Sequence, residues 1–229
     1  MVLVTLGMFL ETRLLFFDSV NITGNMFSDV AFYVFDNSSL NINKSSIANS
    51  DSGLKIFDKS IVTFNDSSIT NIQGIYSGAV EVSNNSSFSA TGSTFDTGFA
   101  DGIDVYDGGT LTLSHSTIKN FILAGVASFG GDKISGPDVV SIDYSNITNN
   151  DVGVDIYNAS SKVPSEVNIG NNSIYNNLSF GARTFSNIVT LSLVNNWWGD
   201  KTGPYNEISN PAGLGNAVSE YVNFAPFCK

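Results

Sequence analysis

Short apolar pairs recur along this chain at nearly constant intervals. In each pair, two apolar residues flank a third residue that is usually polar, and successive pairs lie 22 to 29 residues apart. The pairs begin at Leu15, Leu40, Val62, Phe88, Leu111, Val140, Val167 and Leu191. Seven residues after each of these positions lies another apolar residue, and the eight are Ile22, Ile47, Ile69, Phe95, Ile118, Ile147, Ile174 and Trp198. An offset that never slips indicates a repeated structural unit.

A third apolar stretch closes most units and usually follows a glycine. These stretches begin at Leu54, Val80, Ile103, Val126, Val154 and Ala182. Alternation of apolar and polar residues predicts strands, and no window has helical periodicity of useful length. Three short strands cannot bury their own apolar face, but stacked units can. The sequence therefore predicts an all-β parallel β-helix, a single-stranded solenoid of about eight coils.

The chain divides into three expected parts. Residues 14–194 carry the solenoid pattern, and residues 195–229 form a C-terminal capping segment. Residues 1–13 are a leftover strand of an earlier coil, an N-terminal cap or a degraded signal, and their apolar run is too short to span a bilayer. We therefore expect no transmembrane segment and a chain that belongs to a longer surface protein.

Charge and composition narrow the classes of function. Ten basic residues against 21 acidic ones give a net charge of -11, which argues against nucleic acid as a partner. A single Cys and a single His exclude a disulfide framework and disfavour His-based metal sites or Ser-His-Asp chemistry. Asn-x-Ser/Thr acceptors recur, as at Asn21 and Asn146. They are compatible with a secreted glycoprotein located outside the cell or on its surface.

The repeat resembles the right-handed parallel β-helix repeats of the pectate-lyase-like superfamily. The tail contains Asn-Asn-Trp-Trp-Gly at 195–199 and Gly203-Pro204, and it resembles the segment that ends such helices in archaeal and bacterial surface proteins. The resemblance implies right-handed coiling. It also implies carbohydrate binding or sugar cleavage as candidate functions, although a fold by itself does not specify an activity.

One outward row on the third strand is almost entirely aromatic. It runs Phe35, Phe57, Ser83, Tyr106, Phe129, Tyr157 and Phe185. Rings about 4.8 Å apart could stack on the sugar rings of a polysaccharide, so we take Phe57, Tyr106, Phe129, Tyr157 and Phe185 as candidate carbohydrate-binding residues. Inserts at 130–138 and 158–165 would rim this row. The alternative is that the following loops fold back over the rings.

A neighbouring outward row carries charged residues. Glu81, Asp101 and Asp104 form a candidate Ca²⁺ site, the one cofactor that the sequence brings into question, and a solvated acidic strip is the alternative. Lyases of the resembled superfamily use Arg or Lys as a base with Ca²⁺, so Asp104, Asp155 and Arg183 are the candidate catalytic residues. A plain ion pair between Asp155 and Arg183 competes with that interpretation. The partner motifs of polygalacturonase-type hydrolases are missing.

Three functions are compatible with these features of the sequence. The first is a non-catalytic module of an exported protein that binds a polysaccharide or cell-surface glycan, as an adhesin would. The second is a lyase or glycoside hydrolase acting on acidic polysaccharide. The third is a purely structural spacer of a cell-envelope assembly.

Overall fold

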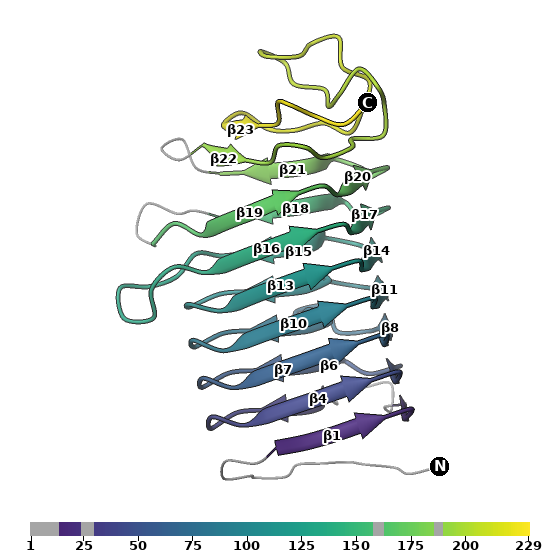
Figure 1. The fold of residues 1–229 in the computed structure, drawn as a ribbon, viewed down its shortest axis with the longest axis vertical. Coiled ribbons are helices and arrows are strands. Elements are labelled where there is room, and N and C mark those ends of the chain that lie inside the picture. The colour runs from purple at the N-terminus through teal and green to yellow at the C-terminus, as the bar shows by residue number, and fades with distance from the viewer. Residues whose placement is uncertain (1–13, 24–29, 158–162, 186–189) are drawn as a thin grey trace.

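The computed structural model describes residues 14–23, 30–157, 163–185 and 190–229, and these residues form strands and turns without a helix. Residues 1–13, and with them the expectation of a leftover strand, cap or signal, lie outside the described residues. Three parallel sheets of seven strands each make a rod (Figure 1). The strands at the front run from left to right while the coils rise, so the winding is right-handed. The fold is the predicted all-β parallel solenoid.

The first sheet contains the recurring apolar pairs. Its strands are β1 (Leu14–Asp18), β4 (Ser39–Asn43), β7 (Ile61–Asn65), β10 (Ser87–Thr91), β13 (Thr110–Ser114), β16 (Val139–Asp143) and β19 (Glu166–Gly170). Neighbouring strands keep the predicted register, as in the pairing of Phe88 with Val62 and Leu111.

The second sheet contains the apolar residue found seven positions later. Its strands are β2 (Asn21–Thr23), β5 (Ser46–Ala48), β8 (Ser68–Ile72), β11 (Thr94–Gly98), β14 (Thr117–Phe121), β17 (Asn146–Thr148) and β20 (Ser173–Tyr175). From Ile47 to Ile174 every member of this row is fully buried, and Trp198 continues it.

The third sheet carries the candidate site on its outer face. Its strands are β3 (Val30–Val34), β6 (Ser52–Ile56), β9 (Val80–Val82), β12 (Ile103–Val105), β15 (Ala124–Ser128), β18 (Val152–Ile156) and β21 (Phe180–Thr184). Close packing between coils requires a glycine at the second position of most of its longer strands. A Cβ on Gly153 would lie 2.4 Å from the carbonyl oxygen of Gly181 on the next coil.

Buried hydroxyl and amide groups tie the coils together at the corner between the first two sheets. Each inward side chain accepts a hydrogen bond from a backbone N–H of the coil before it, for example Ser67 Oγ from Ser45 N at 3.0 Å and Asn172 Oδ1 from Ser145 N at 2.9 Å. These Ser and Asn side chains therefore satisfy backbone groups that the core would otherwise leave unpaired.

The eighth repeat departs from the other seven. Its first strand, β22 (Leu191–Ser192), pairs with β23 (Val222–Asn223) in a separate two-stranded sheet. Residues 195–229 lie across this end of the stack (Figure 1). Trp198 is fully buried there, and Gly181 N donates to Ala217 O at 2.7 Å. An open coil end would expose apolar side chains and unpaired strand edges, and this segment covers both.

Candidate functional site

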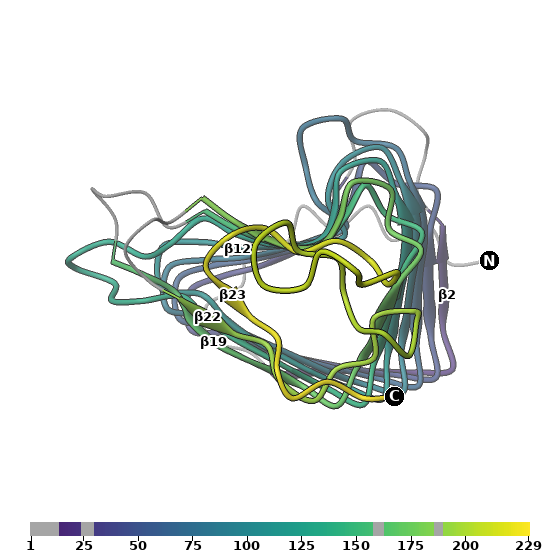
Figure 2. The same ribbon diagram turned by 90° about the horizontal axis from the view of Figure 1, so that it is seen from above.

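Equivalent side chains of the third sheet lie directly above one another. Seen along the stack, the coils superimpose (Figure 2). Pairing of the strands confirms the predicted charged row, which runs Tyr33, Lys55, Glu81, Asp104, Ala127, Asp155 and Arg183. We call it the polar row. It places Lys55 and Arg183 toward the two ends and the carboxylates between them.

The aromatic row lies where the third strand meets the following turn. Backbone hydrogen bonds continue the sheet through this position, for example from Tyr106 N to Val82 O at 3.1 Å and from Tyr157 N to Ser128 O at 2.7 Å. In the shortest turns the next two residues have positive φ, as Asn84 and Asn85 do. Such tight turns leave the preceding side chain pointing outward at the corner.

Most rings of the aromatic row stack on one another. Phe129 and Tyr157 have centroids 5.1 Å apart with planes 8° from parallel, and Tyr157 and Phe185 are 4.8 Å apart at 16°. Phe35 and Phe57 form a second stack at 5.4 Å. Nearly parallel rings with centroids this close are in stacked contact. A ring inside such a stack has a ring on both sides, so it presents mainly its edge to solvent.

The row is interrupted at Ser83, and an opening lies there. Tyr106 makes no ring contact with another described residue, and its hydroxyl reaches back one coil to donate to Glu81 Oε2 at 3.2 Å. The opening has a volume of about 320 Å³, at the small end of ligand pockets. It is lined by Lys55, Ile56, Phe57, Glu81, Ser83, Asn84, Tyr106 and Asp107. We call it the Ser83 notch.

Polar groups at the notch form a connected chain. Lys55 Nζ lies 3.0 Å from Glu81 Oε1 and donates to Ser77 Oγ at 3.1 Å. Burial and the nearby Glu81 charge raise the pKa of Tyr106 to about 12. Tyr106 therefore keeps its proton at neutral pH and remains a hydrogen-bond donor.

Asp101 and Asp104 bring two carboxyl groups together beside the polar row. Burial raises the pKa of Asp104 well above its ordinary value, and the charges of Asp101 and Glu81 act in the same direction. Oδ1 of Asp104 is buried and has no donor among the described residues. Asp101 Oδ1 accepts from Ala124 N at 2.6 Å, and burial raises the pKa of Asp101 as well. A proton on one of these two carboxyls would supply the missing donor.

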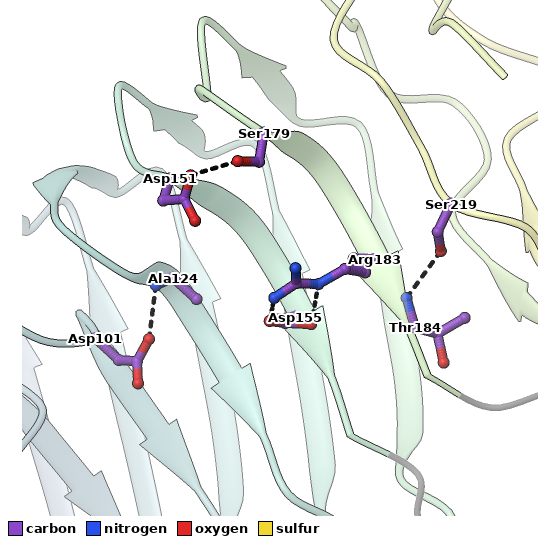
Figure 3. A network of polar contacts seen from close by, with 8 residues as sticks. All are labelled: Asp101, Ala124, Asp151, Asp155, Ser179, Arg183, Thr184 and Ser219. Atoms are coloured by element: carbon purple, nitrogen blue, oxygen red, sulfur yellow. Dashed lines mark hydrogen bonds and ion pairs between the residues drawn. The ribbon is translucent and has the colours of Figure 1, made fainter.

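Asp155 and Arg183 form an ion pair on adjacent coils (Figure 3). Nε donates to Oδ1 at 3.2 Å and Nη2 donates to Oδ2, which makes a bidentate fork. The Asp155 side chain is 2% exposed and that of Arg183 is 26% exposed. The Arg183 guanidinium also lies 4.7 Å from the centroid of the Phe185 ring. Both members of the candidate catalytic pair are therefore engaged with each other or with neighbours.

The insert at 130–138 extends beyond the other coils (Figure 2) and is anchored by a residue that sequence reasoning missed. Asp138 is fully buried and accepts from Ser128 Oγ and Gly108 N, both at 2.9 Å. An antiparallel bridge joins Gly131 to Val163 of the second insert, whose residues 158–162 lie outside the described part. The two inserts thus meet beside the ring stack of Phe129, Tyr157 and Phe185. The sequence signal that could have identified Asp138 is the position of an acidic residue at the end of the insert.

Among the described residues, no group of three or more His, Cys, Asp or Glu side chains could hold a metal ion. Glu81 lies one coil before Asp101 and Asp104, as predicted, but the three carboxylates are not arranged as a metal-binding group. In the same part of the chain, no helix is long and apolar enough to cross a membrane.

Comparison with protein-family models, curated proteins and solved structures gives no match. The class that the fold defines is a parallel β-solenoid repeat protein.

Proposed function

We propose that this solenoid is a non-catalytic glycan-binding module of an exported surface protein. The observation that carries the proposal is the pairing of the aromatic row with the polar row along one face, interrupted by the Ser83 notch of about 320 Å³. Carbohydrates expose both C–H faces and hydroxyl groups. A surface that sets ring faces and edges beside hydrogen-bonding side chains matches both.

The rest of the chain is consistent with such a role. A rod of stacked coils offers a long rigid face, and rigid surfaces lose little entropy when a polymer binds. A net charge of -11 favours a soluble, self-repelling surface. The resemblance to the pectate-lyase-like superfamily, the export and the glycosylation at Asn-x-Ser/Thr acceptors are part of this proposal.

A glycan array tests the proposal. The native chain is expected to bind at least one glycan class, and the triple variant Tyr106→Ala/Phe129→Ala/Tyr157→Ala is expected to lose that binding. Tyr144→Ala is the matched control, because Tyr144 is an exposed ring at another corner, where it stacks on His115. A native chain that binds no glycan, or a triple variant that binds like the control, would falsify the proposal.

A polysaccharide-degrading enzyme is the second candidate, and the Asp101–Asp104 pair is the observation that favours it. A carboxyl group whose pKa is raised can act as a general acid. Against it, Asp155 is buried and both it and Arg183 are held in their ion pair. Incubation with uronate polymers and with neutral polysaccharides, with and without Ca²⁺, distinguishes the two. Unsaturated product or new reducing ends that disappear in Asp104→Asn would establish catalysis.

A structural spacer is the remaining outcome of these experiments. It would be indicated by a chain that binds no glycan and releases no product.

A further inference from the structure

The corner where the chain passes from the second sheet to the third carries exposed apolar side chains on three consecutive coils. They belong to the loop between β8 and β9, the turn between β11 and β12 and the turn between β14 and β15. The residues are Ile75, Tyr76, Phe99, Ile122 and Leu123, and each is about half exposed or more. We call them the corner patch.

Backbone hydrogen bonds hold these turns one above the other. Phe99 N donates to Ile72 O at 3.2 Å, and Ile122 N donates to Gly98 O at 3.1 Å. The corner patch therefore follows the stacking axis with a step of about 4.8 Å per coil. The loop between β8 and β9 projects beyond the turns of the next coils (Figure 2), and its Tyr76 is 93% exposed. Together the five side chains present on the order of 600 Å² of apolar surface, and a patch of that size commonly marks an interaction site.

An aspartate closes each end of the corner patch. Asp51 precedes β6 on the coil before it, and Asp151 precedes β18 on the coil after it. Neither carboxylate forms an ion pair with another described residue. Lys119 lies three residues before Ile122, but it is paired with Asp96 at 3.2 Å. The surface is thus apolar in the middle and negatively charged at both ends.

We propose that the corner patch binds an amphipathic α-helix of a partner protein, which lies along the stacking axis and has a basic residue toward each end. Apolar side chains on one face of a helix recur about every 5.4 Å, close to the step of about 4.8 Å between coils. On an extended strand they recur only about every 6.7 Å. Asp51 and Asp151 are four coil steps apart, about 19 Å, which a helix spans in about 13 residues.

The charges argue against the other occupants of such a patch. A second copy of the chain, whether parallel or antiparallel, would place a carboxylate of one copy against a carboxylate of the other at each end. The net charge of -11 also disfavours an anionic lipid surface. A basic helix is instead attracted at both ends. The corner patch lies at the opposite edge of the third sheet from the aromatic row, so this inference does not depend on glycan binding.

A synthetic peptide serves as the probe. It has Leu at positions i, i+3, i+4 and i+7 on an Ala-rich background, and Lys near each end, about 13 residues apart. The control peptide has the same composition, but its Leu residues are distributed around the helix. Fluorescence anisotropy of the labelled peptides measures binding. The native chain is expected to bind the amphipathic peptide about tenfold more tightly than the control peptide, because only the former presents a continuous apolar face.

Variants of the chain locate the binding. Ile122→Ser/Leu123→Ser removes the apolar side chains of one coil and is expected to weaken binding by about tenfold or more. Ile61→Ser is the matched control, because Ile61 is an exposed aliphatic residue on the first sheet, and it is expected to bind like the native chain. Asp51→Asn/Asp151→Asn is expected to weaken binding by about threefold at low salt and by less at high salt.

Circular dichroism confirms that each variant is folded. Tyr76→Ser changes a ring that is 93% exposed, so it leaves the core intact and is expected to weaken binding by about threefold or more even if the double serine variant fails to fold. Equal binding of the two peptides by the native chain, or binding that survives the serine variants, overturns the inference.

Sedimentation equilibrium tests the competing occupant. The native chain is expected to be a monomer, and a native dimer that dissociates in Ile122→Ser/Leu123→Ser would assign the corner patch to a second copy and overturn the inference. Each of these failures leaves the glycan-binding proposal standing, because none of the variants changes the aromatic row.

Discussion

The ion pair between Asp155 and Arg183 gives the sharpest test of how this solenoid is held together. Arg183→Leu removes the guanidinium and leaves an aliphatic side chain of moderate size. The carboxylate of Asp155 would then lose its bidentate partner while its side chain, 2% exposed, remains under the neighbouring coils. The variant therefore strands a negative charge at a site that water hardly reaches.

The size of the effect follows from this burial. Removing one partner of a fully buried pair costs about 3–5 kcal/mol in the free energy of unfolding. Arg183 is 26% exposed, so water can enter the vacated space and solvate Asp155 in part. We therefore expect a loss of about 2–3 kcal/mol, below the range for a fully buried pair. The loss of the cation–π contact between Arg183 and Phe185 destabilises the variant further.

Urea denaturation of matched variants measures this loss. Lys119→Leu is the control, because Lys119 pairs with Asp96 at 3.2 Å with side chains 36% and 26% exposed. The control is expected to lose less than about 1 kcal/mol. The double variant Asp155→Leu/Arg183→Leu is expected to be more stable than Arg183→Leu alone, since no unpaired charge remains. Equal losses in Arg183→Leu and Lys119→Leu, or strict additivity in the double variant, would refute the reasoning.

Three further changes test other parts of the structure. Asp104→Asn is expected to raise the free energy of unfolding at neutral pH. The native chain loses stability as pH rises from 3.8 through the raised folded-state pKa of Asp104. In urea denaturation at a series of pH values, the extra stability of Asp104→Asn should therefore disappear at pH values below 3.8. A stability gain that stays constant with pH would contradict this cause. Gly153→Ala is expected to cost about 1–3 kcal/mol through overpacking. Its Cβ would lie 2.4 Å from a carbonyl oxygen of the next coil, whereas the control Gly170→Ala, with 3.3 Å, should cost less in the same assay. Phe95→Ala removes a fully buried ring and is expected to cost about 3–5 kcal/mol; a midpoint of thermal unfolding equal to that of the native chain would contradict it.

The fold could be predicted from the chain because its signal is repeated in every unit. The apolar residue seven positions after each pair became a continuous buried row from Ile47 to Trp198. One unit is ambiguous, but repeated copies with the same offset are compatible with few architectures. The same periodicity also assigned each outward side chain to its row, and strand pairing confirmed those rows.

The candidate site could be predicted only as a set of rows. Sequence indicated that Phe129, Tyr157 and Phe185 share a corner, but not that they cover one another's faces. It paired Asp155 with Arg183 without revealing that the carboxylate is buried. Asp138 was missed because its contacts, with Ser128 across the insert and with Gly108 of the preceding coil, depend on how the insert folds back.

What the sequence determined by itself is therefore the winding of the chain and the membership of each row, since alternation and spacing depend on local backbone geometry. Only the tertiary structure decided which ring faces are covered and which charges are buried. It also showed that Ser83, one residue in an aromatic row, leaves an opening. Those properties depend on how side chains of adjacent coils fill the space between them, and the period of the repeat carries no information about that packing.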